Sequence, residues 1–97
     1  MLSFDYNDHQ NAINNAFPNI EVEVETAYII GVNNFSLSGV IIYKSLEEDM
    51  YMVVKCLYTE HEIEVLEDQL IDLEGFETFL EVEGKIKELY KIACQVL

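Results

Sequence analysis

The chain has 97 residues and a formal net charge of −14, because 19 acidic residues are set against five lysines and no arginine. This length leaves room for one domain, residues 1–97, and a hydrophobic content of 51% with 11% aromatic residues excludes the disorder that is typical of strongly acidic chains. Because the chain has neither arginine nor a patch of lysines, direct binding to nucleic acid is not expected. No apolar run of ~20 residues and no signal peptide is recognisable, so we expect a cytoplasmic protein with no membrane partner.

Residues 3–17 predict a short N-terminal helix. Spacings of three and four residues bring five side chains onto one face: Tyr6, His9, Ile13, Ala16 and Phe17. Ser3 or Asp5 can cap the start of this helix, and Pro18 is a stop signal. Asparagines are frequent here and are poor helix formers, so the helix should be short and held by packing.

From Ile20 to Ile30 the pattern changes to a period of two, which predicts a half-buried strand. Its outward row begins with three glutamates, Glu21, Glu23 and Glu25. Gly31 and the asparagines that follow provide turn chemistry before the next strand.

Residues 38–58 predict a β-hairpin at the centre of the sheet. Both arms are rich in β-branched and aromatic residues, whereas the connection between them contains Glu47, Glu48 and Asp49 and favours solvent. Because both arms are apolar on both faces, we expect a central strand pair that is buried on two sides. The short links between successive strands predict an antiparallel meander.

Residues 60–66 leave two interpretations open. Glu60, Glu62 and Glu64 alternate with apolar residues and His61, which suits a fourth strand at the edge of the sheet, but the same residues could begin a long helix.

From Leu73 to Val96 the pattern is helical, with Gly84 in the interior marking a bend or a break into two helices. The predicted apolar stripe consists of Phe76, Phe79, Leu80, Ile86, Leu89, Tyr90, Ala93 and Leu97. The fold class that follows is α+β: a three- or four-stranded antiparallel β-meander with a short N-terminal helix and a long C-terminal helix packed on the sheet.

No residue pattern indicates catalysis, so we expect the protein not to be an enzyme. The sequence has two histidines: His9 falls on the packing face of the first helix and is expected in the core, and His61 is expected to be an exposed bystander. Cys56 and Cys94 lie on predicted apolar faces and are expected to be reduced core residues. The chain lacks metal-binding spacings and a phosphate-binding loop, so no metal or cofactor is expected.

The acidic residues form rows. Side chains two residues apart on a strand share a face about 6.6 to 6.8 Å apart, so Glu21, Glu23 and Glu25 should form one straight row and Glu60, Glu62 and Glu64 a second. This spacing is comparable to that of phosphates along a nucleic-acid backbone. Such rows suit either an ordinary solvated strand face or mimicry of nucleic-acid charge, and the scarcity of lysines favours mimicry.

Eleven acidic residues make up the surface expected to bind a partner. They are Glu21, Glu23, Glu25, Glu47, Glu48, Asp49, Glu60, Glu62, Glu64, Glu67 and Asp68. Reversing Glu60, Glu62 and Glu64 to lysine is expected to abolish this binding and to leave the fold intact.

With these rows the chain resembles the small acidic inhibitors encoded by phages and mobile elements, namely anti-CRISPR proteins, anti-restriction proteins and inhibitors of DNA-repair enzymes. The resemblance covers the whole chain in size, charge and the order of helix, sheet and helix. It implies a non-enzymatic protein that binds a nuclease or another basic nucleic-acid-binding protein and covers its DNA-contacting surface, in the cytoplasm of the host cell if the protein is phage-encoded.

The alternative is a self-associating structural or assembly protein, such as a phage morphogenesis component. In this interpretation the two-faced hairpin leaves Tyr43, Tyr51, Val53 and Leu57 uncovered, so that a second copy could form a homodimer through the sheet. The two interpretations differ in their response to salt, because charge pairing is screened and an apolar interface is not.

Overall fold

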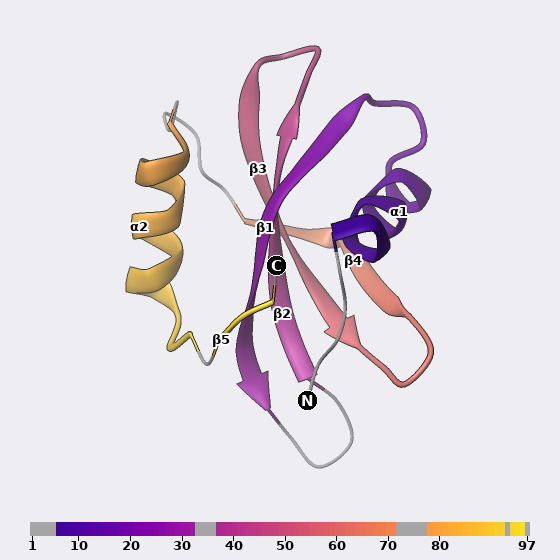
Figure 1. Cartoon of the computed structure of the whole chain (residues 1–97). Helices are drawn as coiled ribbons and strands as arrows, with labels where there is room; N and C mark the ends of the chain where they lie inside the picture. Colours follow the sequence, from indigo (N-terminus) through magenta and orange to yellow (C-terminus); the bar gives the residue numbers. More distant parts are fainter. Residues whose placement is uncertain (1–5, 33–36, 72–77, 93, 97) are drawn as a thin grey trace.

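The computed structural model describes residues 6–32, 37–71, 78–92 and 94–96. In chain order these ranges contain α1 (Tyr6–Ala16), β1 (Val22–Val32), β2 (Leu37–Ser45), β3 (Met50–Tyr58), β4 (Ile63–Ile71), α2 (Phe79–Leu89) and β5 (Cys94–Gln95). The strands form one antiparallel sheet in the order β4-β3-β2-β1-β5 (Figure 1). The predicted α+β class and the four-stranded antiparallel meander are therefore confirmed, and β5 adds a short fifth strand beside β1.

The two helices lie on opposite faces of the sheet (Figure 1). Helix α1 packs against both β1 and β4, although two other strands separate these two in the sheet. The sheet therefore curls around α1 and encloses it on one side. The strands of an antiparallel sheet twist, which makes this curvature favourable.

Each helix covers its own apolar core. The α1 core consists of Ile13, Val22, Val24, Ala27, Ile29, Ile41, Tyr43, Val54, Cys56 and Tyr58. The α2 core consists of Tyr28, Val40, Ile42, Val53, Val82 and Ile86. Successive residues of a strand point to opposite faces, so Ile41 enters one core and Val40 and Ile42 enter the other. The expected central strand pair, buried on two sides, is confirmed.

The expectation that the hairpin leaves an uncovered apolar face is wrong. Tyr43 and Val53 are fully buried, one under each helix, and Tyr51 and Leu57 are half-buried. Tyr43 stacks on Phe17, which follows α1, and Tyr51 lies against Phe79 of α2. The helices thus cover two of the four side chains, Tyr43 and Val53, that the alternative interpretation assigned to a second copy.

Residues 63–71 form a strand, which resolves the ambiguity in this part of the chain. The C-terminal helix is much shorter than expected. It begins after Thr78, whose hydroxyl accepts a hydrogen bond from the Glu81 amide, and it ends before Tyr90, whose backbone is extended. The expected break at Gly84 is also wrong, because α2 runs through this residue.

Helix α2 ends early because residues that follow it pair with the edge of β1. Cys94 and Gln95 pair with Ile29 and Tyr28, and the Val96 amide donates to the Ala27 carbonyl. The buried face of the helix also differs from the predicted stripe: Val82 and Ile86 are buried, whereas Leu80 is 76% and Leu89 49% exposed. Ser3, Asp5, Leu73, Phe76, Ala93 and Leu97 lie outside the described residues.

Candidate functional site

Three of the predicted acidic side chains lie together at the start of β1. Glu21, Glu23 and Glu25 are all exposed, while Val22 and Val24 between them enter the α1 core. Glu21 precedes β1 but continues its ladder, because its carbonyl accepts a hydrogen bond of 2.9 Å from the Leu46 amide. A register shift between Val24 and Thr26 places Glu25 at an irregular position, so the straight row ends there.

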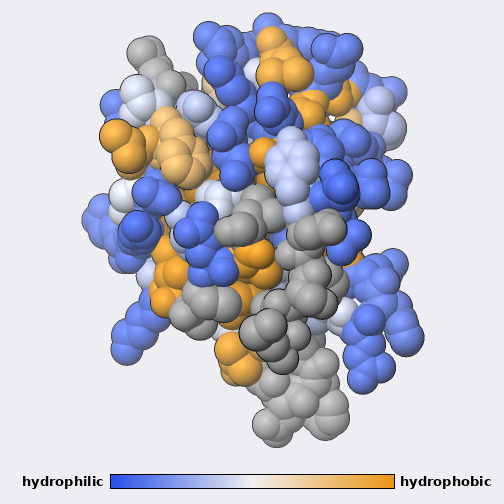
Figure 2. Space-filling view, viewed as in Figure 1, coloured by the Kyte–Doolittle hydropathy of each residue, from blue (hydrophilic) through white to orange (hydrophobic). Residues whose placement is uncertain are grey.

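The second acidic group is the turn between β2 and β3. Glu47, Glu48 and Asp49 are exposed, and Asp49 adopts a left-handed backbone with φ of 54°. Because strand pairing places Val22 beside Ser45, this turn lies at the same end of the sheet as the start of β1. Figure 2 shows hydrophilic side chains on both sides of the turn, at the top of the view.

These two groups form a surface that we call the acidic end. It consists of Glu21, Glu23, Glu25, Glu47, Glu48 and Asp49. All six side chains are exposed, and they come from segments that strand pairing holds side by side.

Sequence reasoning missed the cation inside the acidic end. Lys44 pairs with Glu23 across the strands, and its Nζ lies 2.9 Å from an Asp49 carboxylate oxygen and over the Tyr51 ring. The hydrogen bond to Asp49 raises the pKa of Lys44, and the charge of Glu25 raises it further. The strand register was the missing signal, since Glu23 and Lys44 are far apart in the sequence.

The expected straight row of Glu60, Glu62 and Glu64 is wrong. Glu60 and Glu62 precede β4 in a tight turn that begins at Thr59. The Thr59 hydroxyl accepts hydrogen bonds from the amides of His61 and Glu62 and donates to the Glu62 carbonyl. Threonine often closes such turns with its side chain, and this closure removes the alternation that a strand would impose.

The remaining acidic residues of the predicted surface lie on β4, away from the acidic end. Glu64 is exposed and pairs with Leu57, and Glu67 and Asp68 are exposed in an irregular part of the strand. Here Val65 pairs with Cys56 and Leu70 with Val54, so residues 66–69 of β4 face a single residue of β3. Because β4 begins where β3 ends, Glu60, Glu62 and Glu64 lie at the opposite end of the sheet from the acidic end.

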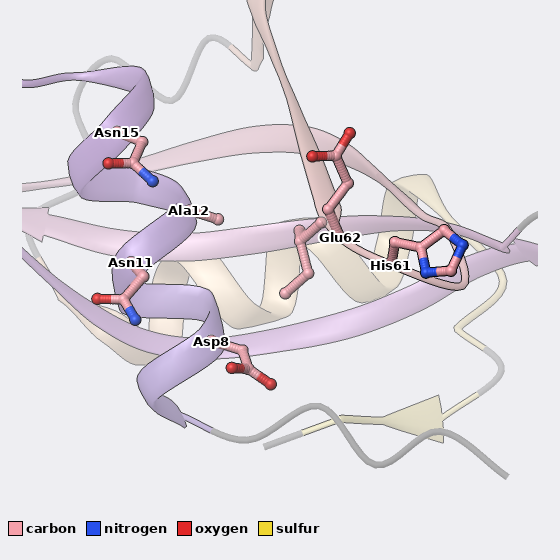
Figure 3. Close-up of a pocket in the computed structure, with 7 residues that line it drawn as sticks. Asp8, Asn11, Ala12, Asn15, His61 and Glu62 are labelled. Atoms are coloured by element: carbon pink, nitrogen blue, oxygen red, sulfur yellow. The ribbon is translucent and has the colours of Figure 1, made fainter.

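A groove runs between α1 and the start of β4 (Figure 3). One part, of about 250 Å³, is lined by Asp8, Asn11, Ala12, Asn15, His61, Glu62 and Ile63. A second part, of about 220 Å³, shares four of these residues and is also lined by Ala16 of α1 and by Val65 and Glu67 of β4. The groove therefore has apolar walls in its middle and carboxylates along its rim.

The burial of the two histidines is as expected from their positions in the sequence. His9 is fully buried, and its Nε2 lies 3.0 Å from the Tyr58 hydroxyl, with the two rings edge to face. Burial raises the pKa of the nearby Cys56 thiol to about 12, so this thiol is not an activated nucleophile. His61 is exposed and lines the groove. The side chain of Cys94 lies outside the described part of the molecule.

No family model matches the chain, and no curated protein or solved structure shows significant similarity to it. Within the described ranges, no helix has the length and apolar character needed to cross a membrane. Within the same ranges, no three His, Cys, Asp or Glu side chains gather in a way that could hold a metal ion.

Proposed function

We propose that this protein is a non-enzymatic, acidic inhibitor that binds a basic nucleic-acid-binding protein or nuclease, in the manner of an anti-CRISPR or anti-restriction protein. The observation that carries the proposal is the acidic end, where six exposed carboxylates from the start of β1 and the β2–β3 turn share one end of the sheet with a single lysine, Lys44. The net charge of −14 adds a long-range field that would steer a basic partner toward the protein.

The geometry of the acidic end suits a surface that normally holds a phosphate backbone. Glu21 and Glu23 project from alternate positions of one extended segment, about 6.8 Å apart. The neighbouring turn supplies three further charges, and its ion pair between Lys44 and Asp49 is at the surface and easily exchanged. A partner with lysines and arginines in a groove for DNA or RNA could place them against these carboxylates instead.

The first experiment is capture of a partner from a lysate of a candidate host, with the purified protein as bait. Washing at about 0.1 M and then about 1 M salt shortens the Debye length from about 10 Å to about 3 Å, which should release a partner held by charge. We expect one basic nucleic-acid-binding protein that is also displaced by added DNA. Retention at high salt, or indifference to DNA, would contradict mimicry.

Two matched variants then locate the surface. The first carries Glu21→Gln, Glu23→Gln and Glu25→Gln, and the second carries Glu60→Gln, Glu62→Gln and Glu64→Gln. Each removes three negative charges, so a loss caused by net charge alone would be equal in the two. We expect the first variant to lose about tenfold or more in affinity. The second should lose less, which replaces the loss expected for these residues from the sequence, because their charges lie at the other end of the sheet. The reverse order would reject the acidic end as the binding surface.

A further inference from the structure

The groove between α1 and β4 has the shape and polarity of a site for an extended peptide. On its helical wall the lining residues follow one stripe, from Asp8 through Ala12 to Asn15 (Figure 3). Ala12 and Ala16 have short side chains and so leave space beside the helix, and Ile63 and Val65 form the apolar bottom of the groove. The Asn11 and Asn15 amides line the same wall and can each donate or accept a hydrogen bond.

The strand beside the groove has an open edge. Among the strands that the structure describes, β4 is the last of the sheet, and it pairs with β3 alone. The Thr59 amide donates a hydrogen bond to the Glu62 carbonyl, so these two residues form a hydrogen-bonded pair. Along β3 and β4, hydrogen-bonded and non-hydrogen-bonded pairs alternate from this point. It follows that Glu64 directs its backbone groups toward β3, whereas Ile63 and Val65 direct theirs outward. Within the described residues, no hydrogen bond engages these outward groups of Ile63 and Val65.

The charge around the groove selects the occupant. Asp8, Glu62 and Glu67 line it, and Glu64 lies on β4 between the last two. The sequence has no lysine or arginine in residues 1–43 or 56–84, which supply both walls. A second copy would bring an identical edge, so that its glutamates would face the same glutamates across the new strand pair, which is unfavourable.

We propose that this groove binds an extended, basic segment of a partner protein, which adds to the sheet as a strand along β4. The backbone of the segment would hydrogen-bond to Ile63 and Val65, and its apolar side chains would point toward Ala12. The lysines or arginines between them would point to the other face, where Glu64 projects, and the carboxylates of the groove would add to the attraction. This inference does not depend on the proposed function, because it uses the other end of the sheet and a different mode of contact.

The test uses a fluorescent peptide, acetyl-Lys-Val-Lys-Val-Lys-Val-amide, and two control peptides. The first control has the same sequence with alternate backbone amides methylated, which keeps every charge and removes donors to β4. The second replaces each lysine with glutamate. Fluorescence anisotropy should show binding of the unmodified peptide, a loss of about tenfold or more on methylation and no binding of the acidic peptide. Amide resonances of Ile63 and Val65 should shift on binding.

Protein variants give the matching comparison. Ala12→Leu fills the groove and should weaken binding about tenfold, and Glu64→Gln should weaken it about threefold. Glu88→Gln, the same change on α2, should leave binding unchanged, and circular dichroism of each variant checks the fold. Equal binding of the methylated peptide would reduce the effect to nonspecific charge attraction and overturn the proposal. So would the absence of binding, or a loss confined to variants of the acidic end.

Discussion

Gly39 lies at a tightly packed position of the sheet. A Cβ atom at this position would lie 2.6 Å from Cε2 of Tyr58 and 2.8 Å from the Tyr28 carbonyl oxygen. Tyr58 is buried in the α1 core with its hydroxyl hydrogen-bonded to His9, and Tyr28 is buried in the α2 core on the neighbouring strand, so neither atom can move without disturbing a core. We expect Gly39→Ala to lower the free energy of unfolding by about 3 kcal/mol or more.

The matched control is Gly84→Ala. Gly84 lies inside α2, and nothing is within 4 Å of the position its Cβ would occupy. Alanine there should raise the free energy of unfolding by up to about 1 kcal/mol, because glycine is a poor helix former. Urea unfolding of both variants measures the difference, and a Gly39→Ala protein as stable as the native chain would contradict the tight packing described here.

Among the elements, β1 has an outer edge whose backbone groups need hydrogen-bond partners. β5 pairs with this edge at Tyr28 and Ile29, and the Val96 amide extends the cover to the Ala27 carbonyl. Farther along, the Gln10 side chain of α1 takes the place of a strand: its Oε1 accepts from the Val24 amide at 2.8 Å, and its Nε2 donates to the Val22 carbonyl at 2.9 Å. Helix α1 thereby blocks a position at which another chain could pair with β1.

A single exchange tests this role of Gln10. Gln10→Glu keeps the size of the side chain, but an ionised carboxylate cannot donate to the Val22 carbonyl and would lie against its oxygen. We expect the free energy of unfolding to fall by about 1–3 kcal/mol in urea titrations. Asn14→Ala, which removes one exposed bond to Gln10, should cost less than about 1 kcal/mol. Equal losses in the two variants would show that the β1 edge does not depend on Gln10.

For the molecule as a whole, burial of ionisable groups predicts unfolding at alkaline pH. Burial raises the pKa of Tyr43 to about 12 and that of Cys56 to about 12, and burial with a hydrogen bond to Glu83 raises the pKa of Tyr28. In the unfolded chain these groups lose their protons near pH 10 for tyrosine and near pH 8.5 for cysteine. Unfolding therefore releases protons in this range, and stability should fall as the pH rises from about 9 to 12.

The midpoint of urea unfolding, measured at about pH 8, 10 and 11, checks this dependence. Tyr43→Phe removes one of the titrating groups and should make the decline shallower between pH 10 and 11, even though deprotonation of lysines adds repulsion in both proteins. A native midpoint that stays constant up to pH 11 would contradict the assigned burial of these groups.

The parts of the fold that could be predicted from the sequence are those that local patterns determine. The alternation of Val22 and Val24 with glutamates and the two-faced apolar arms of the hairpin both follow from side-chain burial on a strand. The length of α2 could not be predicted in this way. Its end depends on pairing of residues 94 and 95 with β1, a contact between segments about 65 residues apart that leaves no periodic signal.

The candidate site was predicted in part for the same reason. That Glu21, Glu23 and Glu25 are exposed follows from the strand pattern, and their positions are as expected until the irregularity at Glu25. The prediction of a row at residues 60–64 is wrong because the Thr59 hydroxyl closes a turn there. The groove could not be foreseen, since it requires α1 to lie beside a strand that follows it by about 50 residues.

The curl of the sheet around α1 also constrains the order in which the protein can be completed. Helix α1 leaves the ribosome before the strands that it packs against, yet one of its two supporting strands is β4, and His9 must meet Tyr58 across 49 residues. Any nascent chain that ends before Ile63 lacks that support, so α1 must wait while most of the sheet is synthesised. Closing so long a loop is entropically costly, and helix α1 is thus among the last elements to gain its full set of contacts.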